Sequence, residues 1–188
     1  MRLDQPRIAP VELDALDADQ KDALGVMLEG GRVINIFRTM ARKPKALKRF
    51  LEWGGYILSR RNSVPARERE IAILRVGWNC RSGYEWTQHV PIAVRAGVTE
   101  AEVAAIKVGA DDPSWSEADR AILRAVDDLT GDFFVSEASW AAVRAHWSEE
   151  QAMDLVYTVG QYTQVSMALN SFGVQLDEGQ VLDPDFRR

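Results

Sequence analysis

The segment "NCRSGYEWTQHV", residues 79–90, holds the side chains of this sequence that are best suited to chemistry. It contains the only cysteine, Cys80, and one of the two histidines, His89, with Glu85 four residues before that histidine. A histidine beside a carboxylate can exchange protons near neutral pH, which general acid–base catalysis requires, whereas a cysteine can support redox chemistry. The segment is therefore a candidate acid–base site, a candidate redox site, or an ordinary helix with some polar residues.

Helical spacing separates these possibilities. At about 100° per residue, Ser82, Glu85 and His89 fall on one side of a helix, and Glu85 and His89 can touch. Cys80 would lie roughly opposite this polar stripe, so it is not directed toward the histidine. The spacing therefore argues against a redox site. It permits an acid–base face, and it permits a structural His–Glu pair that fixes helix packing.

A second carboxylate, Glu70, precedes the nearly continuous apolar run "IAILRVGW". A carboxylate at the head of a helix interacts favourably with the helix dipole, so Glu70 has a purely local explanation. Its other explanation is that it faces a group within the protein that needs a negative charge.

Aromatic and polar residues surround these candidates. Tyr84 and Trp86 supply apolar surface on the other faces of the His89 helix, which predicts that much of this helix is buried. Further along, Tyr162, Ser166 and Asn170 recur at four-residue spacing on one predicted helix. This polar line could face a pocket, or it could form hydrogen bonds across a helix–helix or subunit interface.

The elements that must position these residues are helices almost throughout. Thr99 with Glu102 and Ser148 with Gln151 form capping boxes, and apolar residues behind the helix starts recur with a helical period. Alternating period-two runs are nearly absent, so we predict an all-α fold in a single domain. The predicted helices span residues 11–29, 33–42, 44–60, 65–78, 82–96, 99–107, 116–130, 136–146 and 148–172.

Composition limits the possible classes of function. The chain has 188 residues, of which 46% are hydrophobic and 27% charged, which is typical of a globular domain. Its net charge of −5 disfavours a nucleic-acid partner, because phosphate binding needs clustered Lys and Arg. The single cysteine allows no intramolecular disulfide and fits a reducing compartment.

Membrane, leader and metal signals are absent from the sequence. No stretch approaches the roughly 18 unbroken apolar residues of a membrane span, and the first residues lack the apolar core of a signal peptide. Two histidines far apart in the chain do not have the spacing of a metal site. We therefore predict a cytoplasmic protein without a metal and without a membrane partner.

The residues "RERE-IAILRVGWNCRSGYEWTQHVPIAVRAGVTEAEVAAI" resemble the carboxymuconolactone decarboxylase / AhpD-like family. "YEWTQHVPIA" is the most specific piece, and the resemblance covers residues 33–177. It implies an AhpD-like helical domain at 33–177, a helical extension at 1–32 and a tail at 178–188. That tail contains Pro184 and is expected to extend along a neighbour or stay mobile. The resemblance also implies a cytoplasmic homo-oligomer, a trimer or a hexamer.

The family has two chemical branches, and they differ in this stretch. The peroxidase branch carries a Glu, a Cys-x-x-Cys pair twelve residues later, and a His four residues after the second Cys. In this register Glu70 and His89 match, whereas Ser82 and Glu85 replace the two cysteines. The two cysteines that the dithiol cycle of the peroxidase branch requires are therefore missing here, and Cys80 does not align with either of their positions.

The decarboxylase-type branch keeps the Glu and the His, and it implies removal of CO₂ from a carboxylated unsaturated lactone in aromatic-compound catabolism. No metal or organic cofactor is needed, because the conjugated carbonyl accepts the electrons that CO₂ leaves behind. His89 would return the proton to carbon. Glu85 or Glu70 would hold the His89 ring, and the other would orient the small-molecule substrate. The residues expected to bind this substrate are Ser82, Tyr84, Trp86 and Tyr162.

Two alternatives to this lyase remain open at the level of sequence. One is a thiol peroxidase-type antioxidant protein that uses Cys80 alone or with a partner's thiol. The other is a non-catalytic oligomeric family member in which the His–Glu pair is structural. The sequence identifies neither the substrate nor the glutamate that contacts His89.

Overall fold

The computed structural model describes residues 1–187 and contains helices, turns and loops but no β-strand in that range. The all-α fold that the sequence predicts is therefore confirmed. A short 3₁₀ helix, Pro184–Phe186, follows ten α-helices: α1 Ala18–Leu24, α2 Val26–Glu29, α3 Asn35–Met40, α4 Pro44–Leu58, α5 Ala66–Asn79, α6 Gly83–Arg95, α7 Glu100–Val108, α8 Glu117–Gly131, α9 Glu137–His146 and α10 Glu149–Phe172.

The helix predicted at 11–29 is wrong in its first part and in its continuity. Residues 11–17 are not helical, because α1 begins only after Asp17, whose side chain forms a capping box with Gln20. Gly25 then separates α1 from α2 with a φ of +43°, a conformation that interrupts a right-handed helix. The capping boxes predicted at Thr99 and Ser148 are both present.

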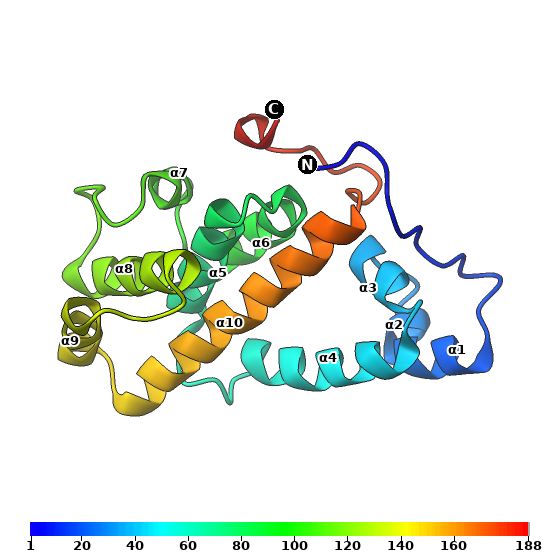
Figure 1. Ribbon diagram of the computed structural model, residues 1–188, viewed down its shortest axis with the longest axis horizontal. Helices are drawn as coiled ribbons and strands as arrows, with labels where there is room; N and C mark the ends of the chain where they lie inside the picture. Colours follow the sequence, from blue (N-terminus) through cyan, green and yellow to red (C-terminus); the bar gives the residue numbers. More distant parts are fainter. Residues whose placement is uncertain (188) are drawn as a thin grey trace.

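Helix α5 lies at the centre of the fold. It packs against α6, α8, α10 and α7, and nearly all of its residues from 69 to 77 are buried. Helix α10 crosses the molecule diagonally, with α8 and α9 on one side of it and α1 to α4 on the other (Figure 1). The nearly continuous apolar run after Glu70 follows from this position, since a helix surrounded by other helices has no solvent face.

The N-terminal helices form a separate layer that closes over α6 and α10. Ile36 of α3 packs with Tyr84 of α6 and with Val165 and Leu169 of α10. The backbone N–H of Ile36 also donates a hydrogen bond to the Tyr84 hydroxyl at 3.2 Å. These contacts hold α3 and α4 beside the helix that carries His89.

The C-terminal tail packs on its own chain. Phe186 is buried against Trp78 of α5 and Trp86 of α6, with ring centroids 5.3 and 5.6 Å apart, respectively. Lys107 of α7 forms ion pairs with Asp183 and Asp185 of the tail at 2.7 and 2.6 Å. The tail was expected either to extend along a neighbour or to stay mobile. As far as residue 187 it lies along neighbouring helices of its own chain, and residue 188 lies outside the described part.

The turn between α5 and α6 contains an arginine in a conformation that favours glycine. Arg81 has a φ of +54°, and the turn is closed by hydrogen bonds from Arg81 N–H to Trp78 O at 3.0 Å and from Ser82 N–H to Gly77 O at 2.8 Å. A side chain in the left-handed region costs about 1–2 kcal/mol because its Cβ crowds the backbone.

We therefore expect Arg81→Gly to raise the free energy of unfolding by about 1 kcal/mol, since glycine has no Cβ to strain. Urea denaturation of the purified protein measures this change. Arg81→Ala is the matched control, because it removes the guanidinium and keeps the Cβ, so it should give no comparable gain. An equal gain from both variants would show that the charge, and not the backbone, is the cause.

Candidate active site

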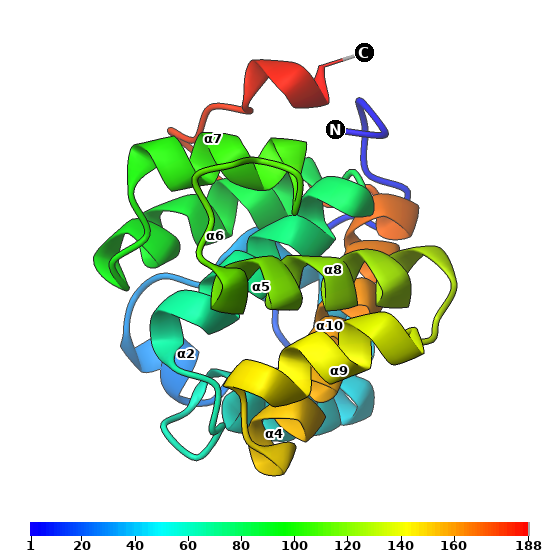
Figure 2. The same cartoon turned by 90° about the vertical axis from the view of Figure 1, so that its left-hand side faces the viewer.

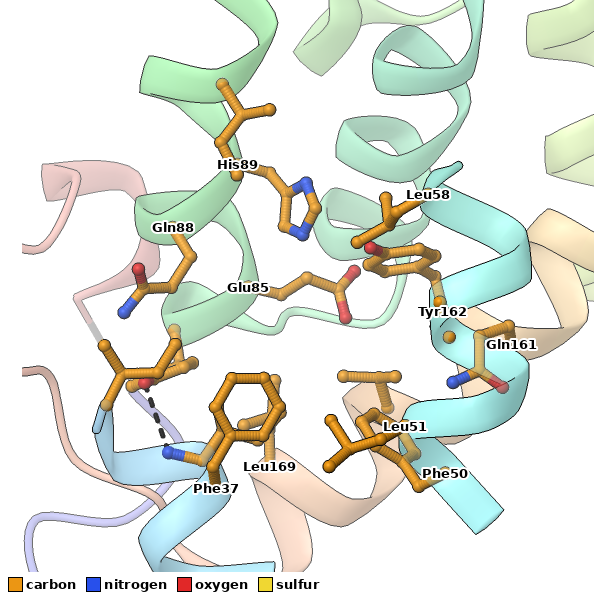
Figure 3. A pocket seen from close by; sticks show the side chains of 17 residues that line it. Phe37, Phe50, Leu51, Leu58, Glu85, Gln88, His89, Gln161, Tyr162 and Leu169 are labelled. Atoms are coloured by element: carbon orange, nitrogen blue, oxygen red, sulfur yellow. Dashed lines mark hydrogen bonds between the residues drawn. The ribbon is translucent and has the colours of Figure 1, made fainter. Parts of the chain in front are cut away.

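A cavity of about 340 Å³ lies between the N-terminal helices α3 and α4 and the helices α6 and α10. Figure 3 shows the side chains of both layers directed into it. Its lining consists of Ile34, Ile36, Phe37, Phe50, Leu51, Gly54, Gly55, Leu58, Tyr84, Glu85, Gln88, His89, Ile92, Gln161, Tyr162, Val165 and Leu169. This size suits a small ring compound.

The lining is polar on one side only. The charged and polar side chains come from α6 and α10, whereas α3 and α4 contribute Phe37, Phe50, Leu51 and Leu58. Among the described residues, no lysine or arginine lines this cavity. A ligand in the cavity therefore has apolar contacts on one face and acid–base groups on the other.

The partner of His89 is Glu70, not Glu85. His89 Nδ1 lies 2.8 Å from Glu70 Oε2, and both side chains are buried. Glu70 belongs to α5, so the contact spans the α5–α6 interface, and its carboxylate occupies the Nδ1 side of the ring. The ring of Tyr162 lies edge-on to the imidazole, with the centroids 4.9 Å apart. These two contacts fix the orientation of the His89 ring in the cavity wall.

Glu85 makes a different contact. Its Oε2 accepts a hydrogen bond from the Ser166 hydroxyl at 2.9 Å, while its buried Oε1 has no hydrogen-bond partner among residues 1–187. Gly77 of α5 allows this close approach, because a Cβ there would lie 3.2 Å from Oε1. Burial, and after it the negative charge of Glu70, raises the pKa of Glu85 well above its ordinary value of 4.5. The cavity therefore contains a carboxyl group that favours its neutral form.

This raised pKa makes stability depend on pH in a defined direction. Between the unfolded pKa near 4.5 and the higher folded pKa, the folded protein binds more protons than the unfolded chain, so stability falls as pH rises. We expect Glu85→Gln, which does not titrate, to be more stable than the wild type at pH 7.

The gain in stability should shrink as pH falls and vanish below about 4.5, where both forms of the protein are neutral at this position. Thermal denaturation of both proteins over a pH series measures it. Glu12→Gln, at an exposed carboxylate, is the control and should show no such gain. The stability of Glu85→Gln minus that of the wild type should be larger at pH 7 than at pH 4. The opposite order contradicts the assignment.

Two of the residues expected to bind substrate lie outside the cavity. Trp86 faces the tail, where it packs on Trp78 and Phe186 and donates a hydrogen bond from Nε1 to Asp183 at 3.2 Å. Ser82 is completely buried just before α6 and does not line the cavity. Trp86 lies about 100° around the helix from Glu85, on the side of α6 that packs against Trp78 and Phe186. This cavity therefore does not support their assignment to substrate binding, which stays a prediction.

The two tyrosines do line the cavity, with different surroundings. The Tyr84 hydroxyl is engaged, since it donates to Asp177 at 2.8 Å and accepts from Ile36 N–H. Tyr162 is buried beside His89, and burial together with the charges of Glu70 and Glu85 raises its pKa well above 10. Tyr84 therefore holds the two layers together, and Tyr162 presents a neutral phenol.

Sequence reasoning did not find Gln88 and Gln161, which add polar groups beside His89 and Tyr162. It also did not find Phe37 and Phe50, which form the opposite wall. The glutamines are adjacent in sequence to recognised candidates, so their position was a usable signal. No signal in the sequence marked the two phenylalanines, because their position in the cavity wall depends on how α3 and α4 pack.

Cys80 caps the C-terminal end of α5 and does not line this cavity. Burial, with a smaller contribution from the charge of Glu85, raises the pKa of its thiol to about 11. A thiol with such a pKa is protonated at neutral pH and is a weak nucleophile. Residues 1–187 also contain no group of three His, Cys, Asp or Glu side chains placed to hold a metal ion.

Residues 44–128 match the model of the carboxymuconolactone decarboxylase family. This part of the chain is similar to that family. The match runs from α4 into α8 and includes Glu70, Glu85 and His89, so the family segment supplies the acid–base wall of the cavity. No curated protein matches the chain. Among residues 1–187, no helix combines the length and the apolarity that a membrane crossing requires.

Solved structures of AhpD-like proteins share the fold of this chain. An uncharacterized peroxidase-related protein with an alkylhydroperoxidase AhpD core from Ralstonia eutropha JMP134 superposes with a TM-score of 0.79 at 21% identity, covering 92% of this chain and 93% of its own. A peroxidase-related protein from Silicibacter sp. TM1040 gives 0.76 at 14% identity, covering 94% and 95%. The debrominase Bmp8 in complex with 2,3,4-tribromopyrrole gives 0.75 at 17% identity, covering 91% of each chain. The AhpD-like helical fold is thereby confirmed.

Proposed function

We propose that this protein is a cofactor-independent acid–base enzyme of the carboxy-lyase type, acting on a small carboxylated unsaturated lactone or a related ring-derived acid. The observation that supports this proposal is the buried His89–Glu70 pair. His89 lines a cavity whose opposite wall is apolar, beside Glu85, whose raised pKa favours the protonated carboxyl. An acid–base pair in such a cavity suits proton transfer to carbon in the absence of bulk water.

The apolar wall of the cavity would favour the first step, the loss of CO₂. A substrate carboxylate in this cavity loses its hydration and meets no lysine or arginine among the described lining residues, so its charge is poorly stabilised. Breaking the carbon–carbon bond releases CO₂ and moves the electron pair into the conjugated carbonyl. The negative charge then spreads over a dienolate, which an apolar site disfavours less than a localised carboxylate.

The polar wall of the cavity would supply the groups for the second step, protonation of the dienolate. Glu70 occupies Nδ1 of His89, so Nε2 is the ring atom left to exchange a proton with the substrate. His89 as imidazolium donates that proton to the dienolate carbon and completes the product. Glu85 in its neutral form can donate a hydrogen bond to the dienolate oxygen, which stabilises charge as it develops. Glu70 is thus a positioning residue, and His89 and Glu85 are the catalytic residues.

Turnover of 4-carboxymuconolactone tests the proposal, with loss of ultraviolet absorbance and release of CO₂ followed together. We expect turnover by the wild type and unchanged turnover by Cys80→Ser, because no proposed step uses the thiol. Reduction of a hydroperoxide by the wild type that is lost in Cys80→Ser would favour the thiol peroxidase alternative. Absence of turnover with this compound and with a panel of related unsaturated ring acids would reject the lyase and favour a non-catalytic family member.

A further inference from the structure

A second cavity, of about 1040 Å³, lies where the N-terminal segment, the α5–α6 turn, the end of α10 and the tail meet. Figures 1 and 2 both show the two chain ends beside the C-terminal end of α10. None of its lining residues also lines the cavity that contains His89. It is therefore a distinct site, and the proposed reaction does not use it.

Three arginines give this cavity an excess of positive charge. Arg2, Arg7 and Arg81 line it, and within residues 1–187 none of them forms an ion pair with a carboxylate. Arg2 donates to the carbonyl oxygen of Cys80 at 3.2 Å, and Arg7 is 3.5 Å from that of Ser171. Carbonyl contacts of this kind leave most of the five N–H groups of each guanidinium available.

The acidic residues of the cavity do not neutralise this charge. Asp4 and Asp185 also line it, but Asp185 is already paired with Lys107 at 2.6 Å. The chain as a whole carries a net charge of −5. The three unpaired arginines therefore give this cavity a local charge opposite in sign to that of the whole chain. Guanidinium groups bind phosphate and carboxylate in a bidentate geometry, which identifies the complementary ligand as an anion.

The backbone conformation of Arg81 is an independent observation in favour of a ligand site. It occupies the left-handed position of the α5–α6 turn, where glycine would be less strained. Its side chain is exposed, so no buried contact of that side chain offsets the strain. Strained backbone conformations persist where a side chain is needed for function, and here the side chain lines the cavity.

Two aromatic rings are among the apolar side chains that line the same cavity. Trp78 and Phe186 both line it and meet edge to face, with centroids 5.3 Å apart and ring planes at 88°. We propose that this cavity binds a small organic anion, a phosphate or carboxylate group attached to a planar ring, with the three arginines holding the charged group and the two aromatic side chains contacting the ring.

Calorimetric titration of the full chain at low salt tests this proposal, with phenyl phosphate, benzoate and inorganic phosphate as probes. We expect saturable binding of at least one ring-bearing anion, and weaker binding of inorganic phosphate, which lacks the ring. Tighter binding of phenyl phosphate than of benzoate assigns the site to phosphate compounds, and the reverse order assigns it to carboxylates. Arg81→Gly should weaken binding about tenfold, the effect of losing one charge-assisted contact, although it stabilises the fold.

The triple variant Arg2→Gln, Arg7→Gln, Arg81→Gly should abolish binding. Arg60→Gln with Arg61→Gln is the matched control, since these arginines are also exposed but lie outside the cavity, and it should bind as the wild type does. His89→Ala should likewise bind normally, which separates this site from the proposed active site. The proposal is overturned if neither ring-bearing anion binds saturably, or if the triple variant binds them as tightly as the wild type.

Discussion

His89→Ala is expected to lower kcat/KM for the carboxylated lactone substrate by about 10²–10⁴-fold, the usual contribution of a positioned general acid. Among the described lining residues, His89 is the one whose side chain is held by the buried Glu70 carboxylate, so its removal takes away the proposed proton donor. Initial rates of ultraviolet absorbance loss over a range of substrate concentrations measure the effect.

Two controls make the His89 result specific. Gln88→Ala changes the adjacent lining residue and should alter KM more than kcat, because Gln88 donates its side-chain hydrogen bonds to Asp177 and Gln180 and has no proposed role in proton transfer. Circular dichroism and thermal denaturation establish whether His89→Ala still folds. A folded His89→Ala protein with wild-type turnover would remove His89 from the mechanism.

Trp86→Ala is expected to lower the free energy of unfolding by about 3–5 kcal/mol, as large-to-small substitutions of buried aromatic residues do. Its side chain is 2% exposed and supports both Trp78 and Phe186, so truncation leaves a cavity under the tail. Chemical denaturation measures the loss. Turnover per folded molecule should stay close to that of the wild type, because Trp86 does not line the cavity that contains His89.

Trp86→Phe separates the packing of this ring from its hydrogen bond. It keeps one aromatic ring in place and loses the N–H that binds Asp183 together with part of the buried indole, so we expect a loss smaller than that of Trp86→Ala. If Trp86→Ala instead left stability nearly unchanged and removed turnover, Trp86 would bind substrate as its position beside Glu85 in the sequence suggested.

Local signals in the sequence were sufficient to determine the helices of this protein. The capping boxes at Thr99 and Ser148 and the helical period of apolar residues act between positions three or four apart, so a single sequence reports them directly. The failure at residues 11–29 is of the same local kind, because Asp17 and Gly25 are themselves local start and stop signals. The replacement of the Cys-x-x-Cys pair by Ser82 and Glu85 was likewise visible without a structure.

The pairing of residues across helices was decided only by the tertiary structure. His89 has Glu85 four residues away, yet it contacts Glu70 on another helix, while Glu85 bonds to Ser166 of α10. Trp86, one residue from Glu85, turns toward the tail, and Phe37 and Phe50 reach the cavity from helices remote in sequence. Spacing along a helix fixes which side chains share a face, but the packing of that face against α5, α10 and the N-terminal layer determines which of them meet, which are buried and which face a cavity.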